Sequence, residues 1–188
     1  MTRKYEITDI QHPDKPNLFR IRAVRDIPRF NVKAGDLGGC VEHEGNLSQE
    51  GDCWIGGNAL VYGNARAFDN AWVSGNARVC DNGQVYGDAQ VYGNAKVYGA
   101  ARVYGDARVC GAARVCGAAR VYGEIEIMDE MQICGITYIS SNSQIYYSDG
   151  VTAYFNQGDQ GEREGKLIVK GTSSDIEHHK MLARLKLS

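Results

Sequence analysis

Apolar and polar positions recur with a period of six residues between residues 45 and 146, which divide into seventeen blocks without insertion or deletion. The fifth position of a block is Val or Ile in all but two blocks, and the third is Ala or another small residue in most of them. Two apolar positions separated by one polar position are typical of a strand that buries one face. Each block therefore predicts a short β-strand whose third and fifth side chains point inward.

The first position of a block is glycine in thirteen blocks and Asp or Ser in the other four. Glycine readily adopts a positive φ and Asp does so occasionally, so the pattern predicts a bend between consecutive strands. A helix is excluded, because a glycine at every sixth residue would cost about 1 kcal/mol each and the period does not match 3.6 residues. One block cannot bury its apolar face alone, so the repeats predict the stacked coils of a solenoid.

The blocks GDAQVY, GNAKVY and GAARVY, between residues 87 and 104, resemble the hexapeptide repeat of left-handed parallel β-helices. The resemblance implies an all-β, left-handed parallel β-helix solenoid with three blocks, or eighteen residues, in each triangular coil. The best-known proteins with this repeat are trimeric acyltransferases, so a homo-oligomer is expected and a trimer is favoured. A fainter resemblance, in Gly35–Gly39 and in residues 46–54, is to uncharacterised repeat proteins of bacteriophages and prophages.

The segments on either side of the array lack the six-residue pattern. Residues 1–38 alternate apolar and polar positions around a turn, which predicts an N-terminal capping hairpin. Residues 39–146 form the predicted repeat β-helix, and residues 147–188 predict a C-terminal cap and tail with a strand and a short helix. Trp54 and Trp72 occupy outward strand positions, so they form either a contact surface or a surface that the N-terminal cap covers.

Composition narrows the possible environments and chemistries. The 188 residues include 21 basic and 23 acidic side chains, which gives no strong nucleic-acid signal. The N-terminus lacks the apolar run of a signal peptide and no stretch resembles a membrane span, so a cytoplasmic protein is expected. The six cysteines include no Cys-x-x-Cys pair, so no metal site is predicted. Free thiols are favoured in a cytosolic chain, although the implied coil stacks Cys116 on Cys134 closely enough for a bridge.

Side chains eighteen residues apart would lie in vertical columns on such a coil. One corner would then carry an aromatic column beside a carboxylate column, and we interpret it as a partner-binding site that comprises Tyr86, Tyr104, Tyr122, Asp88, Asp106 and Glu124. Carboxylates one coil apart repel by about 1 kcal/mol per pair in water, so a basic partner would stabilise them. The alternative is that this corner is only a solvated edge.

Basic side chains would also form columns on the outward strand faces. The candidate anion-binding or nucleotide-binding residues are Arg78, Lys96, Arg114, Arg102 and Arg120. Guanidinium and ammonium groups bind phosphate through charge-assisted hydrogen bonds. The alternative is that these long side chains extend into water and shield the strands.

No catalytic residue and no cofactor are predicted. The acyltransferases that the repeat resembles depend on a histidine base, but residues 45–177 contain no histidine. Only the tail residues His178 and His179 could supply such a base to a neighbouring subunit, so an acyltransferase stays as the alternative. We favour a non-catalytic phage or prophage interaction protein that blocks or sequesters a host factor, either a defence protein or its anionic nucleotide signal. A structural or assembly component is a third interpretation.

Overall fold

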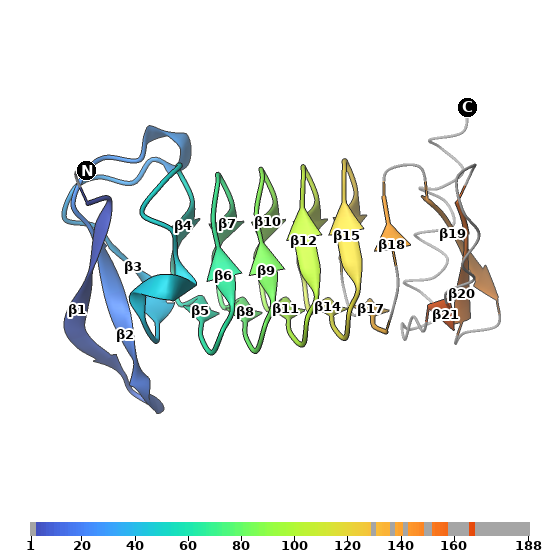
Figure 1. Cartoon of the computed structure of the whole chain (residues 1–188), viewed down its shortest axis with the longest axis horizontal. Helices are drawn as coiled ribbons and strands as arrows, with labels where there is room; N and C mark the ends of the chain where they lie inside the picture. Colours follow the sequence, from blue (N-terminus) through green and yellow to red (C-terminus); the bar gives the residue numbers. More distant parts are fainter. Residues whose placement is uncertain are drawn as a thin grey trace.

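The chain folds as an all-β parallel solenoid of about five turns, as Figure 1 shows for the computed structural model. Residues 3–128, 131–135 and 138–140 are described, together with the backbone of the strands at residues 143–148, 152–157 and 166–167. The solenoid strands are β4 (Trp54–Ile55), β5 (Leu60–Val61), β6 (Arg66–Ala67), β7 (Trp72–Val73), β8 (Arg78–Val79), β9 (Gln84–Val85), β10 (Gln90–Val91), β11 (Lys96–Val97), β12 (Arg102–Tyr104), β13 (Arg108–Val109), β14 (Arg114–Val115), β15 (Arg120–Tyr122), β16 (Glu126–Ile127), β17 (Gln132–Ile133) and β18 (Tyr138–Ile139).

These strands form the three faces of the solenoid. Two faces are five-stranded sheets with the orders β16-β13-β10-β7-β4 and β18-β15-β12-β9-β6, and the third belongs to a sheet that continues from β17 to β5 and into the N-terminal strands. Every solenoid strand pairs in parallel with strands eighteen residues away, so that Val91 lies opposite Val73 and Val109. The predicted fold class and the predicted eighteen residues per turn are therefore confirmed.

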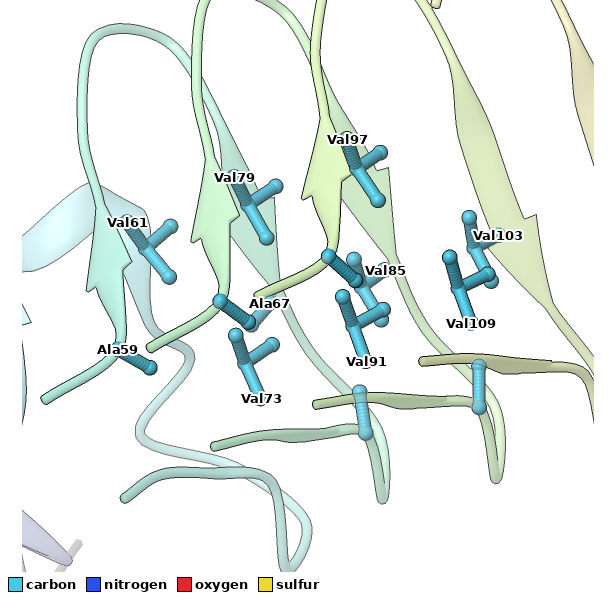
Figure 2. Close-up of a cluster of buried hydrophobic side chains, with 14 of the residues drawn as sticks. Ala59, Val61, Ala67, Val73, Val79, Val85, Val91, Val97, Val103 and Val109 are labelled. Atoms are coloured by element: carbon cyan, nitrogen blue, oxygen red, sulfur yellow. The ribbon is translucent and has the colours of Figure 1, made fainter. Parts of the chain in front are cut away.

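The interior is a continuous stack of small aliphatic side chains. Figure 2 shows Val61, Val79 and Val97 from successive turns pointing into the same interior as the valines of the neighbouring faces. These valines and the intervening alanines are fully buried. The repeated Val and Ala positions therefore fill the central turns, as the sequence pattern predicts, and larger side chains such as Ile55 and Ile127 join the same core toward its ends.

The N-terminal cap consists of three strands and two short 3₁₀ segments. The strands β1 (Tyr5–His12) and β2 (Lys15–Ala23) form the predicted antiparallel hairpin, and β3 (Leu37–Val41) pairs with β2 on one side and in parallel with β5 on the other. The 3₁₀ segments are η1 (Pro28–Phe30) and η2 (Glu44–Asn46). The hairpin thereby extends one face of the solenoid past its first turn (Figure 1).

This cap also covers the two tryptophans. Trp54 is buried, and the half-buried Trp72 stacks against Phe30 of η1 with ring centroids 5.1 Å apart. Of the two interpretations of these residues, coverage by the cap is therefore correct and a free contact surface is not.

The first turn departs from the predicted uninterrupted register. Cys40 pairs with Leu60, and Leu47 pairs with Ala67, so partners there lie twenty residues apart instead of eighteen. Gln49, which the six-residue pattern places inward, instead accepts hydrogen bonds from the backbone of Lys4 and Tyr5 at 2.8 and 3.3 Å and donates one to the Tyr5 carbonyl at 3.1 Å. The side chain that breaks the repeat therefore fastens the start of β1 to the solenoid.

At the other end, the parallel pairing is followed by a different sheet. The strands β19 (Ser143–Ser148), β20 (Thr152–Gln157) and β21 (Lys166–Leu167) pair antiparallel in that order. Residues 143–146 of the last predicted block therefore belong to this antiparallel sheet and not to a further parallel turn. The predicted tail helix lies outside the described residues. Among the residues that the structure describes, no helix is long and apolar enough to cross a membrane.

Candidate anion-binding groove

The structure separates the five candidate basic residues into two columns on different faces. Arg78, Lys96 and Arg114 lie in direct register on β8, β11 and β14. Arg102 and Arg120 lie in register on β12 and β15, in another sheet. The five candidate residues therefore form two separate columns, as an eighteen-residue coil predicts.

The column of Arg78, Lys96 and Arg114 lines one side of an open groove of about 270 Å³. The remaining lining residues are Tyr62, Cys80 and Tyr98. These three follow the inward Val residues of β5, β8 and β11, so they point outward again at the corner that flanks the basic column. Eighteen-residue stacking thus produces a wall of cations beside a wall that contains two aromatic rings.

The three cations of the groove have no acidic partner: no ion pair is found for them anywhere in the described part of the chain. Lys15 of β2 adds positive charge at the rim, where its Nζ lies 4.7 Å from the centroid of the Tyr62 ring. The nearest acidic contribution comes from Asp81, whose carboxylate accepts the Gly99 N–H at 3.0 Å. The groove therefore keeps a positive balance.

The Tyr62 and Cys80 side chains of the groove stay neutral near neutral pH. Burial, together with the hydrogen bond that the Tyr62 hydroxyl donates to the Cys80 sulfur, raises the pKa of Tyr62 to about 12. Burial also raises the pKa of the Cys80 thiol. A thiol whose pKa is raised is a poor nucleophile, because the thiolate is the reactive form. The groove therefore has the chemistry of a binding site and lacks an activated nucleophile at Cys80.

The second basic column is engaged with aromatic rings. The Arg120 guanidinium lies 5.2 Å from the Tyr138 ring centroid, and the Arg66 guanidinium at the start of the same column lies 5.8 Å from the Phe68 ring centroid. Such contacts supply about 0.5–1 kcal/mol at exposed sites. This column therefore fits the interpretation of side chains that shield the strand face better than it fits a ligand site.

The aromatic corner forms the predicted vertical column. Successive rings of Phe68, Tyr86, Tyr104 and Tyr122 are nearly parallel, with centroids 4.7, 4.8 and 5.0 Å apart. Offset or parallel ring pairs of this kind add about 0.5–1.5 kcal/mol each beyond their buried area. The column therefore stabilises the stacked turns and leaves the ring edges half-buried at the surface.

The carboxylates beside these rings are not equivalent. Asp88 pairs with Arg29 of η1 at 2.5 Å and accepts a hydrogen bond from Asn70 at 3.2 Å, so the chain itself uses this carboxylate. Asp106 and Glu124 continue the column as exposed residues. Arg29 carries no repeat signal, which is why the sequence pattern did not reveal this contact.

The cysteines contain one bridge. Cys116 and Cys134 form a disulfide between consecutive turns, with Cα atoms 4.5 Å apart, so the favoured expectation of free thiols is wrong for this pair. The four other cysteines, Cys40, Cys53, Cys80 and Cys110, are free of disulfides. In the described portion, no group of three or more His, Cys, Asp and Glu side chains is placed to hold a metal ion. His178 and His179, on which the acyltransferase alternative depends, lie outside the described residues.

Comparison with known proteins agrees with the geometry of the central turns. Residues 89–105 and 101–117 each match the model of the YdcK β-solenoid repeat. None of the curated proteins that were compared with the chain matches it. Over its central turns, the chain is therefore similar to YdcK β-solenoid repeats.

Proposed function

We propose that this chain is a non-catalytic binding protein whose groove holds a phosphate-bearing anion against Arg78, Lys96 and Arg114. The observation that carries the proposal is the column of three cations on successive turns of one groove, for which the described residues supply no ion pair. A preformed column of this kind binds with little loss of conformational entropy, because the solenoid backbone already holds the three positions in register.

The spacing of the turns favours a ligand with more than one phosphate. Neighbouring turns are about as far apart as the Tyr86 and Tyr104 rings, whose centroids are separated by 4.8 Å. A ligand whose phosphates follow the solenoid axis would therefore meet one cation on each turn. Tyr62 and Tyr98 add aromatic surface beside the cations, where a nucleobase could stack for about 1–3 kcal/mol. A nucleotide with two or three phosphates would therefore contact the cations through its phosphates and the tyrosines through its base.

The test is isothermal titration calorimetry, in which the purified protein is titrated separately with adenosine triphosphate, inorganic triphosphate and adenosine. Adenosine triphosphate should bind most tightly and adenosine most weakly, and added salt should weaken binding because the groove is open to solvent. Combined Ala substitutions of Arg78, Lys96 and Arg114 remove up to three charge-assisted contacts of about 1.5–3 kcal/mol each, so affinity should fall by at least about tenfold.

The matched control substitutes Ala for Arg102 and Arg120, which form a basic column on another face. This variant should bind triphosphates like the unmodified protein. Equal losses in both sets of variants would show only a general charge effect, and the absence of triphosphate binding by the unmodified protein would overturn the proposal.

A second candidate function is capture of a basic protein segment at the corner of Tyr86, Tyr104 and Tyr122. The ion pair between Arg29 and Asp88 supports it, because one carboxylate of this column already binds an arginine of the cap. Asp106 and Glu124 would receive further basic side chains from a partner. Joint substitution of Tyr104 and Asp106 by Ala should leave the fold intact and weaken capture of an arginine-rich peptide. Unchanged capture would reduce this corner to a solvated edge.

The broader interpretation is a phage or prophage protein that sequesters a nucleotide signal of the host or blocks a defence protein. It combines the proposed groove with the resemblance of the repeats to phage and prophage proteins. A cytoplasmic location and a homotrimer belong to the same interpretation, and native mass spectrometry at micromolar concentration tests the trimer directly. A monomeric mass would contradict it.

A further inference from the structure

Lys4 and Cys53 form a buried pair beneath the N-terminal cap. Both residues are fully buried, and Nζ of Lys4 lies 3.0 Å from Sγ of Cys53. The two residues are 49 positions apart in sequence, so the contact exists only because the fold brings the residue before β1 against the first solenoid turn. An amine and a thiol in direct contact inside a protein are two groups that can react with each other once the sulfur is oxidised.

The surroundings hold the nitrogen in place. Lys4 Nζ also donates to the carbonyl oxygens of Glu50 and Gly51 at 3.1 and 3.3 Å. The backbone N–H of Lys4 donates to Gln49 at 2.8 Å. The Cys53 sulfur in turn lies 3.5 Å from the Ser48 carbonyl oxygen. The pair is therefore fixed from both sides, and its separation is set by the fold.

The pKa shifts of the two groups supply a free amine but only a small fraction of thiolate. Burial lowers the pKa of the Lys4 ammonium, which increases the fraction of nucleophilic free amine. Burial raises the pKa of the Cys53 thiol, and the neighbouring Lys4 opposes that increase. Both shifts favour the neutral thiol and amine, so the thiolate that hydroperoxides attack is the minor form, which is reached by transfer of the thiol proton across the 3.0 Å contact to the Lys4 amine.

We propose that Lys4 and Cys53 are a peroxide-sensitive modification site, at which oxidation joins Nζ to Sγ through a sulfenamide bond. The thiolate first attacks hydrogen peroxide, forming an S–O bond, breaking the O–O bond and releasing hydroxide, which takes the ammonium proton and becomes water. The free amine then attacks the sulfenic sulfur, forming the S–N bond and breaking the S–O bond. The departing hydroxide takes a proton from nitrogen as a second water. Sulfur is oxidised by two electrons, and one peroxide is reduced to two waters.

The position of the pair gives peroxide a route to it. Lys4 lies one residue before β1, which is the edge strand of its sheet. Chain ends and edge elements open at lower free-energy cost than the core, so transient opening of this segment admits a small oxidant. After closure, the S–N bond covalently attaches the N-terminal segment to the first turn of the solenoid.

Peptide mapping by mass spectrometry tests the proposal. The purified protein is treated with hydrogen peroxide, its free thiols are alkylated, and it is digested with trypsin. The expected product joins the Lys4 peptide to the Cys53 peptide, weighs two hydrogen atoms less than their sum, resists cleavage after Lys4, and disappears on treatment with excess thiol. Amide exchange of β1 should slow by about tenfold in the linked protein, because local opening is blocked.

Three comparisons make the result specific. Lys4→Arg keeps a cation but cannot form this bond, so Cys53 should then be recovered as a trappable sulfenic acid, and Cys53→Ser should abolish the linked peptide. Cys40 is an internal control, since it is buried with the Arg20 guanidinium and not an amine as its charged neighbour. It lies in the same tryptic peptide as Cys53, residues 34–66, so fragment ions must assign the link to one of the two cysteines. Complete alkylation of Cys53 after peroxide, oxidation to sulfinic acid without a link, or a linked peptide that carries an added oxygen would each overturn the sulfenamide.

Discussion

At the scale of single residues, the corner glycines fix how closely two turns can approach. Gly87 has a φ of +67°, and a Cβ added to it would lie 2.9 Å from the backbone nitrogen of Gly105 on the next turn. Asp69 adopts the same type of conformation one turn earlier, and its carboxylate accepts the Gly87 N–H at 3.2 Å. A residue other than glycine is thus accepted at a corner where its side chain forms a hydrogen bond with the backbone of the next corner.

Substitution Gly87→Ala should destabilise the fold by about 1–3 kcal/mol, since it adds left-handed strain and a close contact with Gly105. The matched control is Gly135→Ala, because Gly135 has a φ of +82° but no atom within 4 Å of the added Cβ. The free energy of unfolding of the control should therefore fall only by the part that comes from backbone strain. Urea denaturation followed by circular dichroism measures both, and equal losses would contradict a role for the contact between turns.

The candidate site was only partly predictable at this scale. The positions of Arg78, Lys96 and Arg114 follow from the eighteen-residue coil, so their column could be predicted before the structure was known. The approach of Lys15 to Tyr62 could not, because no repeat relates the hairpin to the array. For the same reason, the sequence could not show that Arg29 forms an ion pair with Asp88.

At the scale of elements, most solenoid strands contain only two residues, so the side chains and not the strand length provide the stability. Val103→Ala on β12 removes two methyl groups from a site without solvent exposure. The expected loss is about 2 kcal/mol, between the costs of Ile→Val and Leu→Ala substitutions. The neighbouring exposed Arg102→Ala should change the stability by no more than about 0.5 kcal/mol. Chemical denaturation distinguishes the two, and equal effects would mean that inward and outward positions are not distinct.

The strands were predictable because their period is independent of distant contacts, whereas the ends of the array were not. The first turn contains two additional residues, and hydrogen bonds between Gln49 and the start of β1 stabilise this longer turn. Ile145 continues the apolar pattern, yet its strand pairs antiparallel with β20. A six-residue pattern specifies which side of a strand is apolar, but it does not specify which strand lies beside it.

At the scale of the whole molecule, a solenoid is a one-dimensional stack in which each turn contacts only its neighbours. Its unfolding can therefore begin at an end without disturbing the opposite end. The cap covers the first turn through β3 and Phe30. Toward the other end, the disulfide between Cys116 and Cys134 joins β14 and β17 across consecutive turns. The bridge is thus placed to oppose opening of the last parallel turns.

Reduction of this disulfide should consequently destabilise the C-terminal turns more than the N-terminal turns. The closed loop has a sequence separation of 18 residues, for which loss of the crosslink costs about 3 kcal/mol in the chain-entropy description. Hydrogen exchange with and without reductant should show faster exchange in β14 to β17 and little change in β4 to β7. The Cys116→Ser variant should show the exchange rates of the reduced protein, and adding reductant should not change them. The exchange rates of the Cys40→Ser variant should still increase when reductant is added. Uniform acceleration along the chain would mean that the turns unfold as a single unit, which is contrary to a stack of nearest-neighbour contacts.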